Sequence, residues 1–61
     1  MEINTQVYLK KAILDSQERV RDYMNYAGHV EDPKLSGFFK ECAQSEGMQA
    51  SKLKDFLREY E

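Results

Sequence analysis

Few side chains in this 61-residue sequence have the types and spacing that chemistry requires. His29 and Cys42 are the single histidine and the single cysteine, so no CxxC motif or His/Cys cluster exists for a closed zinc site. A lone histidine in a connection is usually a surface residue, and a cysteine in an apolar stripe is usually inert packing. We therefore predict that the protein is not an enzyme and has no catalytic residues.

Composition limits how the chain can fold. The single cysteine excludes an internal disulfide and suits a reducing compartment. A chain of this size buries only about 60% of the surface of its unfolded form, so a lone core is marginal. Disulfides and structural zinc are excluded as supplements, which leaves association with further copies as the expected source of additional core.

Charge and hydropathy exclude two classes of partner. Nine Lys and Arg alternate along the chain with eleven Asp and Glu, for a net charge of −2, so the basic patch of a nucleic-acid binder is absent. Met1-Glu2-Ile3 lacks the basic start of a signal peptide, and no apolar run approaches the roughly 18 residues of a membrane span. We expect a soluble, cytoplasmic protein that binds neither nucleic acid nor membrane.

One break divides the sequence into two helical segments. Gly28 is a helix-stopping residue, and Asp32-Pro33 combines an N-cap residue with a proline suited to the first helical position. We predict a single domain, 1–61, with one helix at about 5–27, a loop at 28–32 and a second helix at about 33–59. Because the connection is short, the helices should form an antiparallel hairpin, and the fold class is all-α.

Each segment carries a heptad-spaced stripe. In the first segment the stripe is Leu9, Ile13, Ser16, Val20, Tyr23 and Ala27. In the second segment the stripe is Leu35, Phe39, Cys42, Glu46, Gln49, Leu53, Phe56 and Tyr60. Flanking apolar residues, among them Phe38, Ala43 and Leu57, widen these stripes beyond what one neighbouring helix can cover.

A second hairpin would cover the remaining apolar surface. We predict a homodimer or higher oligomer that forms a four-helix bundle. The predicted contacts between chains are Phe38, Phe39, Cys42, Met48, Leu53 and Leu57.

Ser16, Glu46 and Gln49 form a polar layer in the predicted seam. Ser16 and Glu46 are nearly equidistant from the connection, so they lie at the same height in an antiparallel pair, with Gln49 one turn further along. An ionised glutamate there needs a proton, a hydrogen-bonded partner or a cation. We expect the layer to set the register, as polar core positions do in coiled coils, with Glu46 protonated or paired with an Arg or Lys of a partner chain.

The spacing of these residues resembles a known family. Tyr23-x-x-x-Ala27, then Asp32-Pro33-x-Leu35-x-x-x-Phe39-x-x-x-Ala43-x-x-Glu46-x-x-Gln49-x-x-x-Leu53, is similar to the hairpin of ferritin-like and rubrerythrin-type proteins over most of the chain. Those proteins hold two irons with a Glu on one helix and Glu-x-x-His on the next. The resemblance implies the scaffold with a reduced ligand set, because Ser16 stands at the first Glu position, Gln49 at the His position, and only Glu46 is retained.

Size and the Asp-Pro hairpin also resemble small helical-hairpin proteins of spore-forming bacteria and their ferritin-like spore-coat proteins, which implies a bacterial protein with a possible spore association. Three functions follow. The first is a non-catalytic structural or interaction protein that associates with itself and needs no cofactor. The second is a non-haem protein that binds iron or another divalent metal through Glu46. The third is a helix-groove adaptor for another protein, which exposed Phe38, Met48 and Leu57 would serve.

Overall fold

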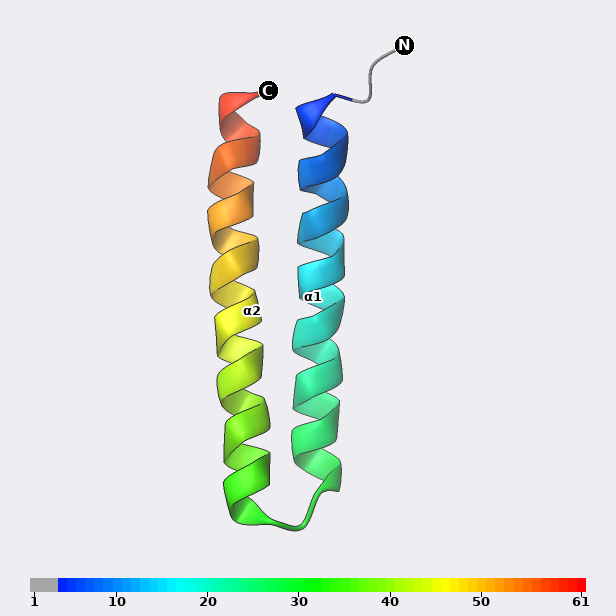
Figure 1. Cartoon of the computed structure of the whole chain (residues 1–61), viewed down its shortest axis with the longest axis vertical. Coiled ribbons are helices and arrows are strands. Elements are labelled where there is room, and N and C mark those ends of the chain that lie inside the picture. Colours follow the sequence, from blue (N-terminus) through cyan, green and yellow to red (C-terminus); the bar gives the residue numbers. More distant parts are fainter. Residues whose placement is uncertain (1–3) are drawn as a thin grey trace.

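The protein is a hairpin of two long antiparallel helices, seen in a computed structural model that describes residues 4–61 (Figure 1). Helix α1 spans Thr5–His29 and helix α2 spans Pro33–Glu59. The predicted all-α hairpin is confirmed. Residues 1–3, which belong to the predicted domain and carry the expectation about a signal peptide, lie outside the described residues.

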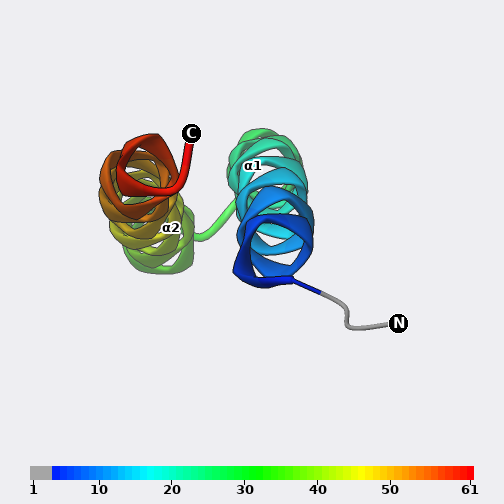
Figure 2. The same cartoon turned by 90° about the horizontal axis from the view of Figure 1, so that it is seen from above.

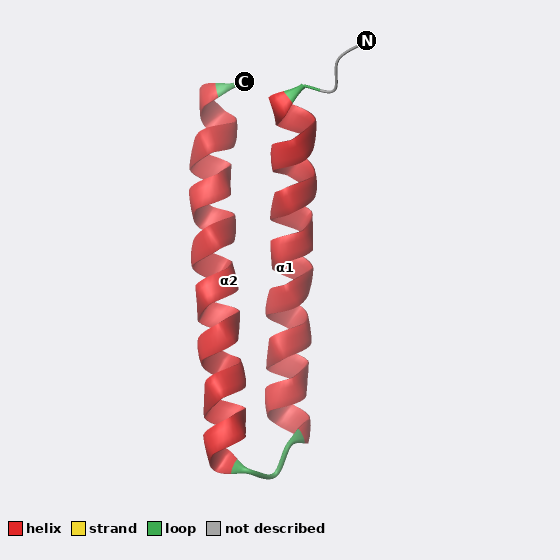
Figure 3. Cartoon of the chain, viewed as in Figure 1, coloured by secondary structure: helices red, strands yellow, loops and turns green. Residues whose placement is uncertain are grey.

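The two helices form a single layer, so each has only one neighbour. Viewed from above, they lie side by side with nothing above or below them (Figure 2), and the Cα atoms extend over 49 × 20 × 10 Å. The described chain consists of helix apart from short segments at its ends and the connection (Figure 3). Within residues 4–61, neither helix combines the length and apolar character that crossing a membrane requires.

Local capping explains where each helix begins. The Asn4 side chain accepts a hydrogen bond from the Val7 backbone N–H at 3.0 Å, and Asp32 accepts one from the Lys34 N–H at 2.9 Å. Each cap satisfies a backbone donor that has no partner within the helix. Pro33 occupies the first turn of α2, where its fixed φ suits the helix and its missing N–H is not needed.

Helix α1 continues two residues past its predicted end. Gly28 was expected to stop the helix, yet no glycine of the described chain has a positive φ, and α1 ends at His29. Nδ1 of His29 lies 2.8 Å from the Asn25 carbonyl oxygen, which can only accept, so Nδ1 carries the hydrogen. The Val30 N–H also donates to the Tyr26 carbonyl at 3.1 Å. These two bonds satisfy carbonyls of the last turn, so His29 lies in the helix rather than in the loop.

The most deeply buried positions between the helices hold mainly small side chains. The buried residues of the described chain are Ile13, Ser16, Ala27, Ala43 and Ala50. Leu9, Val20 and Tyr23 extend the α1 seam as predicted. The α2 seam differs: Phe39, Ala43, Glu46, Ala50, Leu53 and Leu57 face α1, whereas Leu35, Gln49, Phe56 and Tyr60 are exposed. The predicted α2 stripe is therefore rotated toward one flank of the hairpin.

Two polar ties close the ends of the hairpin. Near the connection, the Ser36 hydroxyl donates to the Ala27 carbonyl oxygen at 2.8 Å. At the open end, Nε2 of Gln6 donates to the Tyr60 carbonyl oxygen at 2.7 Å. Together they hold the helix ends in register.

The Asp32 cap generates the first prediction. Asp32→Ala should lower the free energy of unfolding by about 1 kcal/mol, because the Lys34 N–H loses its acceptor. Urea denaturation at fixed protein concentration measures this. Asp32→Asn keeps a capping oxygen and is the control. Equal losses in the two variants would contradict the capping role.

Candidate functional site

An ion pair joins the two helices at mid-height. Nε of Arg19 donates to Oε1 of Glu46 at 2.6 Å, and Nη2 of Arg19 donates to the Ser16 hydroxyl at 3.4 Å. The Glu46 side chain is 13% exposed and that of Arg19 is 49% exposed, while Ser16 is 2% exposed. The hydrogen bond to Glu46 raises the pKa of Arg19 above its ordinary value, with the Glu46 charge adding to the effect and desolvation opposing it. One guanidinium thus serves the carboxylate and the hydroxyl together.

Arg19 supplies the partner that Glu46 was expected to find elsewhere. We expected Glu46 to be protonated or paired with another chain, whereas the structure places its partner on the same chain. Arg19 was missed because it lies beside the α1 stripe, not on it. The available signal was its position one turn after Ser16, from which a long side chain can reach across the seam.

Gln49 does not join this layer within the hairpin. Ser16 and Glu46 come together through Arg19, but Gln49 is exposed and Ala50 takes the buried position one turn beyond Glu46. The reason is the rotation of the α2 seam, which turns Gln49 toward the flank. Its part in a polar layer stays a prediction about an assembly of chains.

The donor set does not fit the iron site of ferritin-like proteins. Such a site needs bridging carboxylates and imidazoles. At mid-height the seam offers the Glu46 carboxylate and the Ser16 hydroxyl, and the guanidinium of Arg19 already occupies the position where a cation would compensate Glu46. No group of three His, Cys, Asp or Glu side chains gathers anywhere in residues 4–61.

Aromatic side chains cover the flank on which Arg19 lies. Tyr23 stacks on Phe39 with ring centroids 6.1 Å apart, and Tyr26 meets the same ring edge-on at 5.5 Å. Residues three or four positions apart lie on the same side of a helix, so this flank continues along both helices. We call it the aromatic face, and its exposed members are Tyr8, Tyr26, Leu35, Phe38, Phe56 and Tyr60, which are 41% to 63% exposed.

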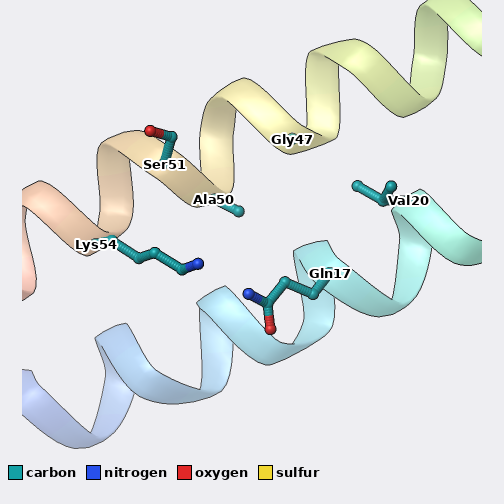
Figure 4. Close-up of a pocket in the computed structure, with 6 residues that line it drawn as sticks. All are labelled: Gln17, Val20, Gly47, Ala50, Ser51 and Lys54. Atoms are coloured by element: carbon teal, nitrogen blue, oxygen red, sulfur yellow. The ribbon is translucent and has the colours of Figure 1, made fainter.

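The opposite flank is a groove. Three hollows of about 290, 310 and 400 Å³ follow one another between the helices. Figure 4 shows the middle hollow, where Ala50 points toward α1 and the side chains of Gln17 and Lys54 approach one another. Exposed Leu14 and Met24 border the other two. We call this flank the groove face.

The remaining predicted residues lie in different places. Phe39, Leu53 and Leu57 are half-buried against α1, and Cys42 is half-buried. Phe38 is 59% exposed on the aromatic face, whereas Met48 is 73% exposed. Met48 lies on the side of α2 opposite to Glu46 and Ala50, so it points away from α1. The role of these residues in contacts between chains stays a prediction.

Fold and site together define a helical-hairpin protein with a charged tie at its centre. Comparison with known proteins adds no family, because no family model, no curated protein and no solved structure matches the chain.

The ion pair generates the second prediction. Arg19→Ala should destabilise the fold, because it leaves the largely buried Glu46 carboxylate without its partner. Lys11→Ala is the matched control, since the Lys11–Asp15 pair is exposed on α1. The double variant Arg19→Ala with Glu46→Leu should recover the lost stability, as an apolar residue needs no partner. Urea denaturation of all variants compares them, and equal losses for Arg19→Ala and Lys11→Ala would contradict the role.

Gly47 generates the third prediction. It lies on the groove face in mid-helix, and a Cβ added there would meet nothing within 4 Å. Gly47→Ala should raise the free energy of unfolding by roughly 0.5 to 1 kcal/mol through helix propensity. Gly37→Ala, which is equally unobstructed, is the control and should gain a similar amount. A loss at Gly47 alone, in denaturation experiments, would show that another helix already packs on the groove face.

Proposed function

We propose that this protein is a non-catalytic structural and interaction protein that acts by associating with itself. Two hairpins pair through their aromatic faces and form a four-helix bundle. The observation that carries the proposal is the contrast between buried positions that are mainly small and a flank of large exposed residues. A face of this kind is typical of protein–protein interfaces, where aromatic side chains are enriched.

The surface area supports association. The accessible surface is 5001 Å² for a chain of 7.2 kDa, whereas a compact monomer of that mass would expose about 4,100 Å². The excess of roughly 900 Å² is close to the approximately 800 Å² that each partner buries in an interface of standard size. A second copy on the aromatic face would therefore bring the chain to the burial expected of a stable protein.

The bundle we propose has the architecture of the ferritin-like and rubrerythrin-type proteins that the sequence resembles. Iron is not part of the proposal, because Arg19 neutralises Glu46. We place the assembly in the cytoplasm, where the free thiol of Cys42 is stable.

The groove face favours a second candidate, a helix-groove adaptor for another protein. Its hollows have small residues at their base, including Ala43, Gly47 and Ala50, and polar side chains such as Gln17 and Lys54 at their rim, so a helix could approach there. The two candidates differ in what the isolated chain does. An adaptor would be folded as a monomer, whereas the self-associating hairpin would lose helix on dilution.

Phe38 generates the fourth prediction. Phe38→Ser removes an aromatic anchor from each copy, so the dissociation constant of the dimer should rise about a hundredfold or more. Met48→Ser is the control, because Met48 is 73% exposed against 59% for Phe38. Met48 points away from both the seam and the aromatic face, so the interface we propose leaves out this predicted contact. Its effect should stay within about threefold. Sedimentation equilibrium, with circular dichroism at the same concentrations, measures both association and helix content.

Two outcomes would contradict the proposal. A wild-type chain that is fully folded as a monomer at micromolar concentration would remove the need for a second copy. A dimer that survives Phe38→Ser but is lost in Gly47→Leu would mean that copies meet through the groove face.

A further inference from the structure

We propose that the Arg19–Glu46 pair determines how two copies meet. The two-fold axis runs along the helices, both connections lie at the same end, and α1 of each copy packs on α2 of the other. This inference rests on the proposed self-association through the aromatic face.

The position of the pair makes it decisive for orientation. Arg19 and Glu46 lie near the midpoints of Thr5–His29 and Pro33–Glu59. Arg19 lies on the aromatic face and reaches Glu46 at the adjoining edge of the seam. A residue at mid-height stays at mid-height under either two-fold operation that stacks two such layers face to face. The charges of one copy therefore meet the charges of the other whichever way the hairpins face.

The pair also has capacity for a second contact. The bond to Nε engages only Oε1 of Glu46, and the Arg19 side chain remains 49% exposed. A guanidinium has five N–H donors, of which this structure assigns one to Glu46 and one to Ser16. A second acceptor can therefore approach Arg19 from the aromatic face.

The two possible axes bring different charges together. An axis along the helices places α1 of one copy over α2 of the other. Arg19 of one copy then lies over Glu46 of the other, and the four charges alternate in sign. An axis across the helices keeps α1 on α1, so Arg19 faces Arg19 and Glu46 faces Glu46. The docked aromatic face excludes water, and like charges in such a place are strongly unfavourable. Charge therefore selects the axis along the helices.

A charge-reversed chain tests the inference. The double variant Arg19→Glu with Glu46→Arg keeps an ion pair within each hairpin and should form its own dimer. In a mixed dimer of this variant with wild type, an axis along the helices sets Arg against Arg and Glu against Glu. The mixed dimer should fall roughly tenfold below its statistical half share. Native mass spectrometry of refolded mixtures, with one chain isotopically labelled, counts the species.

Each outcome decides one point. A mixed dimer at or above half share would overturn the proposed axis, because an axis across the helices would set Arg against Glu and favour mixing. That result would leave self-association intact. Failure of wild type to dimerise would overturn the proposed function and this inference with it.

A distance measurement decides the matter if the charge-reversed chain does not fold. Spin labels at Glu31→Cys, in a Cys42→Ser background, report the separation of the two connections by pulsed electron resonance. Helices packed at 8–10 Å place the labels below about 25 Å if the connections share an end. A separation of about 40 Å, the length of a 27-residue helix, would overturn the inference.

Discussion

The most deeply buried positions between α1 and α2 hold mainly small side chains, and the other features of the hairpin depend on this. Ser16, Ala27, Ala43 and Ala50 are buried where the helices meet, and Ile13 is the one large residue among the buried positions of the described chain. Small residues allow close approach but remove little apolar surface from water. The aromatic rings are left on a flank, where one layer of two helices cannot cover them. The hairpin alone therefore leaves part of its apolar surface uncovered.

The Arg19–Glu46 ion pair at mid-height supplements a seam that buries little apolar volume. A glutamate in the seam is costly without compensation, and Arg19 provides it from the neighbouring helix while it also bonds the buried Ser16 hydroxyl. With Ser36 and Gln6 at the two ends, polar ties fix the register at three heights. The seam is therefore specified by directional bonds more than by apolar volume. The same guanidinium gives the centre of the hairpin a chemistry different from that of a carboxylate-rich di-iron site.

The two flanks of the hairpin are unequal, and the self-association we propose uses only one of them. The aromatic face carries Tyr26, Phe38 and Phe56 around the ion pair, whereas small and polar residues surround Gly47 on the groove face. Large rings contribute apolar area to an interface, and a charge pair at its centre contributes specificity. In the dimer we propose, a single surface combines the apolar area that the second copy covers with the charges that select its orientation.

The sequence by itself determined the hairpin, because its signals are local. Asp32-Pro33 starts α2 by capping, and the α1 stripe through Ile13 and Ser16 matches the buried seam. The tertiary structure decided how α2 is rotated. The apolar stripe of α2 is wide enough to satisfy 3–4 spacing whether Gln49 or Ala50 faces α1. Only the packing of α2 against α1 decides that Ala50 is the buried residue. The tertiary structure also decided the partner of Glu46. The long side chain of Arg19 reaches across the seam from a position that no periodicity marks.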